Sequence, residues 1–158
     1  MMKKLRVIVA DEEPISSSLL RSSLSYWGCD VVRVHSQDEA RTAMQAGNVD
    51  ICILKWDLSG FNCLNLCQWI RQAELKCEPH IIVLMEKASR ENIRAAYLAG
   101  VNDYLTNPFR VEELRSRISA VATRVSQIDS VHCQVGRLDP LECYRLNLAF
   151  HTNTYSRV

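Results

Sequence analysis

The sequence has almost no net charge to attract a charged partner. Among its 158 residues, 19 Lys and Arg stand against 18 Asp and Glu, which leaves a formal net charge of +1. Such a balance provides no basic field that would steer a nucleic acid and no acidic tail. Composition therefore offers nucleic-acid binding no support, and we expect no nucleic-acid partner.

The sequence also lacks a long apolar run near its start. The first one, Val7 to Ala10, is followed at once by acids at positions 11–13. A signal peptide or a membrane-spanning helix needs a much longer apolar stretch. We therefore expect a cytoplasmic protein with no membrane partner.

Cysteine is plentiful, but its spacing lacks the pattern of a metal site. The seven cysteines form no CxxC pair, with which a zinc signal becomes strong. Cys63 and Cys67 are four apart and share a helix face, yet reduced, buried thiols are the simpler interpretation. A thiol sensor would need an exposed cysteine with a low pKa, so that role remains an alternative.

Short apolar segments alternate with segments of helical periodicity. Strands are predicted over residues 5–10, 30–34, 50–55, 80–85 and 101–105, and helices over about 14–27, 37–46, 64–75, 89–99 and 110–127. Ser36 with Glu39 forms a capping box, and Gly28 and Gly100 follow helix ends. This alternation predicts an α/β fold with a doubly wound parallel sheet and helices on both faces.

In such folds the functional site lies beyond the carboxyl ends of the strands. Here that edge carries residues 11–13, 55–57, 85–86 and 106–107. The acidic cluster before Pro14, a turn at Gly60 and the long run AGVNDYLTNPF over residues 99–109 together resemble the receiver domain of two-component response regulators. The resemblance covers about residues 4–127. It implies a flavodoxin-like (βα)5 sheet of order 2-1-3-4-5 and a role in bacterial phosphorelay signal transduction.

The resemblance also assigns a role to individual positions. In the family, two acids hold magnesium beside a phosphate-accepting aspartate, and a hydroxyl residue and a lysine contact the phosphoryl group. The matching positions are Asp11 and Glu12 for the metal-holding acids, Lys55 for the acceptor, Met85 for the hydroxyl residue, Asn107 for the lysine, and Tyr104 for the aromatic switch.

Three of these positions carry the wrong chemistry for phosphate. An ammonium at Lys55 cannot form an acyl phosphate, which needs a carboxylate nucleophile. The Met85 thioether donates no hydrogen bond, and the Asn107 amide brings no charge. We therefore predict an atypical receiver that acts as a phosphorylation-independent interaction module, with neither enzymatic activity nor a magnesium cofactor. Lys55 is expected to lie among Asp11 and Glu12 in an ion-pair cluster that replaces the metal.

Two alternatives stay open at this point. In one, Asp57 accepts phosphate in place of Lys55, with a divalent metal at Asp11 and Glu12. Its position in a loop makes a solvated acid the simpler interpretation, because proximity and orientation dominate such chemistry. In the other, the chain is a remnant or a truncated form of a DNA-binding response regulator.

The partner surface implied by the resemblance is formed by the fourth helix, the fifth strand and the fifth helix, about residues 89–127. A homodimer through this face is a further option. We assign the receiver domain to residues 1–127 and a C-terminal extension to residues 128–158. In the extension, apolar and polar residues alternate over 131–135 and 144–150 on either side of a turn region at 136–140. This pattern predicts a β-hairpin that serves docking or dimerisation.

Overall fold

A parallel sheet forms the centre of the structure, a computed structural model that describes residues 4–135 and the side chains of residues 4–128. Its strands are β1 (Arg6–Ala10), β2 (Asp30–Arg33), β3 (Ile51–Lys55), β4 (His80–Met85) and β5 (Asp103–Thr106). They pair in the order β2-β1-β3-β4-β5, and every pairing is parallel. The predicted doubly wound, flavodoxin-like sheet is therefore confirmed.

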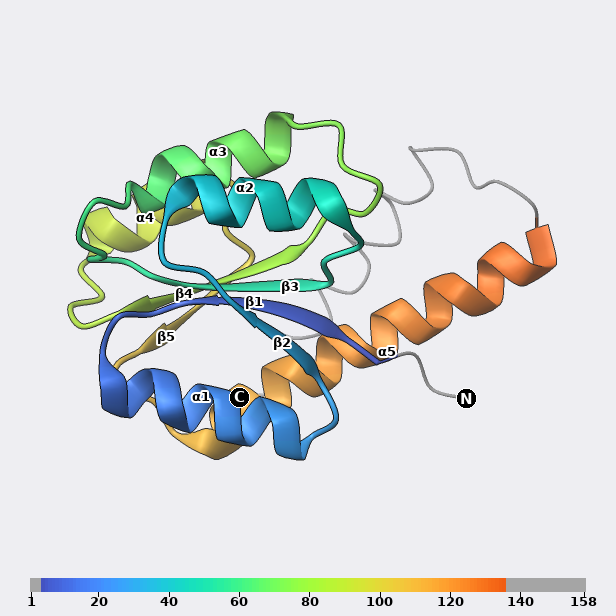
Figure 1. Ribbon diagram of the computed structural model, residues 1–158, viewed down its shortest axis with the longest axis horizontal. Coiled ribbons are helices and arrows are strands. Elements are labelled where there is room, and N and C mark those ends of the chain that lie inside the picture. Colours follow the sequence, from blue (N-terminus) through green and yellow to red (C-terminus); the bar gives the residue numbers. More distant parts are fainter. Residues whose placement is uncertain (1–3, 136–158) are drawn as a thin grey trace. The chain divides into compact units, whose positions relative to one another are not determined.

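Helices cover both faces of this sheet. They are α1 (Pro14–Tyr26), α2 (Gln37–Ala46), α3 (Cys63–Gln72), α4 (Arg90–Leu98) and α5 (Val111–Val135). The helices α2, α3 and α4 lie on one face, and α1 and the beginning of α5 lie on the other (Figure 1). The sheet, helices α1 to α4 and the part of α5 up to residue 123 belong to a compact unit of residues 1–123, and residues 124–158 form a second unit. No helix among the described residues is long and apolar enough to cross a membrane.

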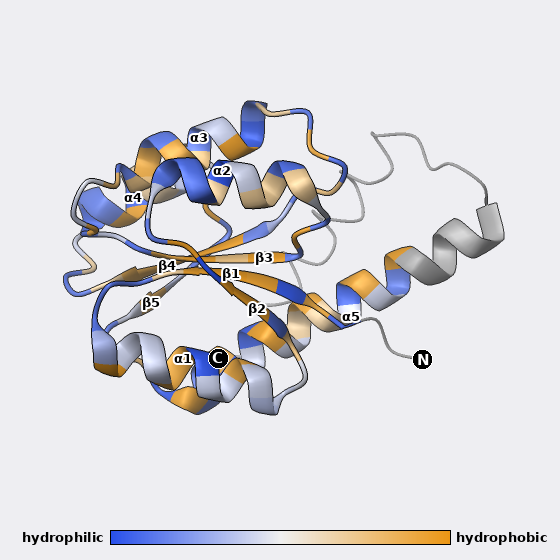
Figure 2. Ribbon diagram, viewed as in Figure 1, coloured by the Kyte–Doolittle hydropathy of each residue, from blue (hydrophilic) through white to orange (hydrophobic). Residues whose placement is uncertain are grey.

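The central strands are buried on both faces, as their apolar sequences predict. Ile8, Cys52 and Val83 belong to the hydrophobic cluster that also includes residues of α2, α3 and α4. Their neighbours along the strands, such as Ile53 and Leu84, are equally inaccessible to solvent. Because successive side chains of a strand point to opposite faces, the sheet separates two layers of core, and Figure 2 shows its strands as the hydrophobic centre.

Helix ends follow the predicted signals. The Ser36 hydroxyl accepts a hydrogen bond from the Glu39 N–H at 3.1 Å, while the Glu39 carboxylate accepts from the N–H of His35 at 2.8 Å. Gly28 and Gly100 have φ of 81° and 98°. A residue with a side chain is strained in this left-handed region, so the glycines suit these ends of α1 and α4.

Arg71 of α3 ties together loops at the edge where the strands begin. Its Nε donates to the Gly100 carbonyl at 2.9 Å, its Nη1 donates to the Pro79 carbonyl at 2.9 Å, and its Nη2 donates to Asn102 Oδ1. The side chain of Asn102 is thus held by hydrogen bonding just before β5 begins. The strand accordingly starts at Asp103, two residues later than predicted.

The C-terminal prediction requires a correction. Helix α5 runs to Val135, so the strand predicted over residues 131–135 is wrong. Extending an existing helix costs far less than starting a new element, and a five-residue alternation does not outweigh that advantage. The other half of the predicted hairpin, residues 136–158, lies outside the described residues. The proposed boundary between residues 127 and 128 falls within α5, and the docking role of the extension remains a prediction.

Candidate functional site

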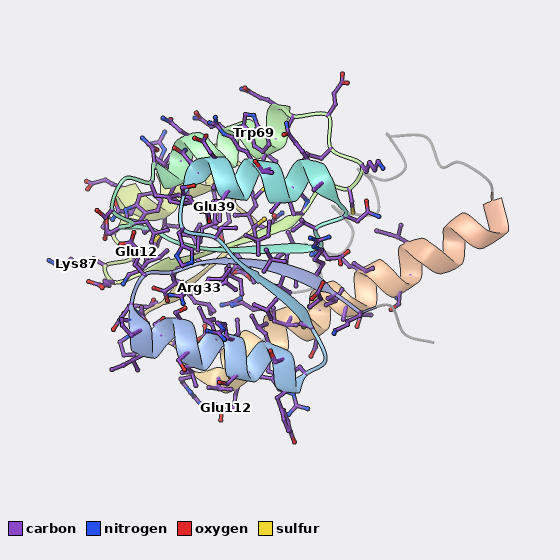
Figure 3. The ribbon with its side chains drawn as sticks, in the orientation of Figure 1. Glu12, Arg33, Glu39, Trp69, Lys87 and Glu112 are labelled. Carbon is purple, nitrogen blue, oxygen red and sulfur yellow. The ribbon has the colours of Figure 1, made fainter. Side chains whose placement is uncertain are left out.

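The carboxyl ends of four neighbouring strands bring the candidate site residues to one edge of the sheet. Asp11 and Glu13 follow β1, Lys55 is the last residue of β3, Glu86 follows β4, and Asn107 follows β5. The loops after β1 and β4 lie at the same end of the molecule, where Figure 3 labels Glu12 and Lys87.

Lys55 lies in an ion-pair network at this edge, which we call the Lys55 cluster: Lys55, Glu13, Glu86 and Asn107. The Lys55 ammonium donates to Glu13 Oε2 at 3.3 Å and lies 3.6 Å from Glu86 Oε1. The Asn107 amide donates to the same Glu13 oxygen at 3.4 Å. Lys55 and Asn107 therefore converge on one carboxylate oxygen of Glu13.

Asp11 lies next to this network and is buried. Asp11 is only 2% exposed, and its Oδ1 accepts a hydrogen bond from the Glu13 N–H at 2.9 Å. The other oxygen, Oδ2, is buried without a hydrogen-bond partner among the described residues. Asp11 thus positions the backbone of Glu13 and adds a buried negative charge near Lys55.

The predicted partners of Lys55 need one correction. The acid that pairs with the ammonium is Glu13, whereas Glu12 is exposed. The hydrogen bond from the Glu13 N–H to Asp11 closes a tight turn with Glu12 at its middle. The side chain of Glu12 therefore points to solvent, and the acid at the start of α1 reaches the end of β3 instead.

Met85 and Tyr104 belong to the core as much as to the edge. Met85 is 0% exposed and is part of the hydrophobic cluster. Its carbonyl accepts a hydrogen bond from the Asn107 N–H at 2.8 Å. Tyr104 is half-buried against the same cluster, and its ring meets that of Tyr97 edge to face, with the centroids 6.5 Å apart. Met85 is thus an apolar side chain that fills the core.

Asp57 lies outside the Lys55 cluster. It occupies the turn after β3, and its side chain is exposed. The preceding Trp56 is partly buried and packs against the hydrophobic cluster. This placement is the one expected of a solvated loop acid.

The sequence model of the family described as "Response regulator receiver domain" matches residues 7–119. This chain belongs to that family. A phosphate regulon transcriptional regulatory protein of Pseudomonas aeruginosa, PhoB, is 30% identical over 144 residues, which are 89% of this chain and 62% of the relative. The chain thus spans less than two thirds of that relative.

Solved structures agree with this assignment. A response regulator from Chloroflexus aurantiacus is similar with a TM-score of 0.68 and 26% identity, and the match covers 77% of this chain and 99% of that one. The receiver domain of Ssk1 from Saccharomyces cerevisiae, solved with the phosphotransfer protein Ypd1, has the same fold. Its TM-score is 0.69 at 20% identity, with 78% of this chain and 92% of that one covered.

Charge at the edge of this receiver domain favours a protonated Lys55. Burial alone lowers the pKa of its ammonium, since the side chain is only 13% exposed. The hydrogen bond to Glu13 and the charges of Asp11, Glu13 and Glu86 together outweigh burial and raise the pKa above its usual value. Lys55 therefore carries a fixed positive charge at neutral pH.

No disulfide joins the five described cysteines of the receiver domain to one another, and four of the five are buried. A hydrogen bond between Cys63 and Cys67 raises the pKa of Cys63, with burial adding to the rise, and lowers the pKa of Cys67. Within residues 4–128, no group of three or more His, Cys, Asp or Glu side chains is placed to hold a metal ion.

Sequence reasoning missed Glu13 and Glu86 as partners of Lys55. Both were visible as acids at the correct edge of the sheet. The resemblance to receiver domains directed attention to positions 11 and 12 instead. A charge-balance argument could have found them, because a mostly buried ammonium needs nearby acids.

Proposed function

We propose that this chain is an atypical receiver domain that recognises a signalling partner without being phosphorylated. The observation that carries the proposal is the Lys55 ammonium at the acceptor position, 3.3 Å from Glu13 and 3.6 Å from Glu86. An ammonium offers no carboxylate to attack a phosphoryl donor. The signalling pathway and the cytoplasmic location are part of the same proposal.

The Lys55 cluster also supplies what a magnesium ion would otherwise supply. The acids of a receiver edge repel one another and need a cation. Here the Glu13 oxygen already accepts from both Lys55 and Asn107. A divalent ion would have to approach a fixed ammonium and displace these bonds. We therefore expect the edge to hold a single conformation in the presence or absence of magnesium.

Partner recognition is proposed to use the face of α4, β5 and α5. Two large apolar side chains of α4 are exposed there, Tyr97 at 40% and Leu98 at 77%. Arg117 of α5 pairs with Asp103 of β5 at 2.7 Å and with Glu113 at 3.0 Å, which joins the two elements. Exposed apolar residues beside fixed charges suit a protein partner. A homodimer through this face remains a prediction.

Exposure to a small-molecule phosphodonor tests the proposal. The chain is incubated with acetyl phosphate and magnesium, and its intact mass is compared with that of a receiver whose acceptor aspartate is present. We expect the control to gain a phosphoryl group and this chain to gain none. An adduct that disappears in the Asp57→Asn variant would instead establish Asp57 as a surrogate acceptor.

A second candidate function rests on the relatives. PhoB of Pseudomonas aeruginosa is a transcriptional regulatory protein, and this chain spans 62% of its length. The chain would then be a DNA-binding regulator whose output lies in its C-terminal residues 128–158. Binding of duplex DNA that weakens steeply with salt would support this role, and no binding at low salt would argue against it.

A further inference from the structure

A groove of about 350 Å³ lies beside the Lys55 cluster, between the start of α1 and the loop that joins β5 to α5. Helix α1 and the beginning of α5 lie on the same face of the sheet (Figure 1). The lining of the groove includes Glu13, Ile15, Ser16, Leu19, Glu86 and Phe109, and it does not include Lys55. The volume of the groove falls at the lower end of the range of small-molecule sites, about 300–1,000 Å³.

Two carboxylates of the Lys55 cluster give the groove its charge. Lys55 reaches Glu13 Oε2 at 3.3 Å and Glu86 Oε1 at 3.6 Å. Among the described residues, neither Glu13 Oε1 nor either carboxylate oxygen of Glu86 accepts a hydrogen bond. With the buried Asp11, three carboxylates share one ammonium. Negative charge is therefore left over where Glu13 and Glu86 line the groove.

The rest of the lining is largely apolar. Ile15 and Leu19 of α1 are 80% and 40% exposed, and Phe109 adds an aromatic ring from the loop before α5. Exposed apolar side chains that are grouped at a hollow often mark a binding site. Ser16 also lines the groove, and its hydroxyl is buried without a hydrogen-bond partner among the described residues. Buried polar groups usually have a partner, and an N–H donor in the groove would supply one.

We propose that this groove binds a small organic cation, an ammonium or guanidinium group carried on an aromatic or aliphatic body. The charge of the ligand meets Glu13 and Glu86, whose free oxygens accept its N–H groups, and its body covers Ile15 and Leu19. Hydrogen bonds of this kind are charge-assisted and stronger than neutral ones. The inference goes beyond the signalling proposal and does not depend on whether the chain is phosphorylated.

The combination of charge and apolar surface sets what the groove discriminates. Magnesium demands several oxygen ligands in octahedral geometry and stays largely hydrated, so Ile15 and Leu19 offer it nothing. The carboxylates repel an anion, and a neutral apolar molecule leaves their charge unbalanced. The lining lies entirely within the unit of residues 1–123, so the ligand needs no second chain to complete its site.

Amide NMR titration of the full chain with phenethylamine tests the proposal. Phenethyl alcohol has nearly the same shape without the charge, and methylammonium has the charge without the apolar body. We expect the amides of Glu13, Ile15, Ser16, Leu19 and Phe109 to shift together and saturate with phenethylamine. The Kd for either control compound should be higher by about tenfold or more.

Two variants separate the charge from the apolar lining. Glu86→Gln should raise the Kd for phenethylamine by about two- to fivefold, because it removes one partly exposed ion pair. Ile15→Ser should raise the Kd by a similar factor, because it removes apolar contact. Glu74→Gln and Tyr26→Ser change an exposed acid and an exposed apolar residue outside the groove lining and should bind like the wild type. All four positions are exposed, and the amide spectrum of each variant checks that it is folded.

Several outcomes would overturn the proposal. Groove amides that do not shift with phenethylamine would do so, as would an equal Kd for phenethyl alcohol or for methylammonium. An unchanged Kd in a folded Glu86→Gln or Ile15→Ser variant would place the amine elsewhere. Magnesium that shifted the same amides as strongly would assign the charge to a metal site instead. Shifts of these amides on dilution of the chain without any amine would assign the groove to a second copy.

Discussion

Replacing Lys55 with methionine would remove the charge that neutralises the acidic edge of the sheet. Methionine keeps the length and the apolar stem of the side chain, so packing at the end of β3 changes little. The ammonium, however, no longer balances Glu13, Glu86 and the buried Asp11. We expect Lys55→Met to lower the free energy of unfolding at neutral pH.

Distances and exposure set the size of this loss. A unit charge pair at 3.3 Å is worth about 1 kcal/mol in water and about 5 kcal/mol at an effective dielectric constant of about 20. Glu13 is 42% exposed and Glu86 is 60% exposed, so solvent screens both pairs and the lower figure is the better guide. Removal of the desolvation cost of the lysine offsets part of the loss, and the uncompensated charge of Asp11 adds to it. We expect a net loss of about 1–3 kcal/mol.

Urea unfolding followed by tryptophan fluorescence and circular dichroism measures this loss. Lys87→Met, at an exposed lysine, is the matched control and should change stability by less than about 0.5 kcal/mol. Adding Glu13→Gln to Lys55→Met should restore part of the lost stability, because the double variant no longer has that unbalanced charge. A Lys55→Met variant as stable as the wild type would refute the view that the ammonium neutralises this edge.

Four further predictions concern the same domain. The triple variant Lys55→Asp, Met85→Thr, Asn107→Lys should show a rise in melting temperature on addition of magnesium, which the wild type should lack. Equal responses of the two proteins would argue that the Lys55 cluster does not prevent magnesium binding. Because folding raises the pKa of Lys55, its stabilising contribution is present below the unfolded-state pKa of about 10.4 and is lost as pH rises through the higher folded-state pKa. The stability difference between wild type and Lys55→Met should therefore hold from neutral pH to about pH 9 and shrink above about pH 10.5, as pH-dependent urea unfolding would show. Arg71→Met removes three hydrogen bonds of the guanidinium and should lower the free energy of unfolding in urea by about 2–4 kcal/mol. Arg71→Lys should restore little of this loss, and a loss below about 0.5 kcal/mol in Arg71→Met would contradict this role. Among the described thiols, Cys77 should react first with a thiol reagent in the native state, since it is partly exposed and the other four are buried. If mass spectrometry found a buried thiol modified first, the structure around that thiol would have to open locally.

The order of strands and helices could be predicted because the signals are local. A buried parallel strand reads as a short apolar run, and caps such as Ser36 and glycines such as Gly100 mark helix ends within a few residues. The strand over residues 80–85 was predicted with the bounds that the structure shows for β4. The edge that carries the site followed from the parallel topology alone.

The details of the site depend on interactions that a linear pattern does not contain. One hydrogen bond, from the Glu13 backbone N–H to the Asp11 carboxylate, turns the loop. This turn decides that Glu13, and not Glu12, meets Lys55. The length of α5 could not be read from residues 131–135, because a short stretch with alternating polarity also fits a helix when the preceding turns already define one.

The most direct test of a phosphorylation-independent receiver is an amide NMR titration of the full chain with magnesium and then with beryllofluoride, a phosphoryl mimic. If Lys55 has replaced both the acceptor and the metal, the amides of Asp11, Lys55, Met85 and Tyr104 should not shift under either addition. Joint, saturable shifts of these amides would contradict the account. They would show that the edge still binds metal and phosphoryl groups despite the lysine.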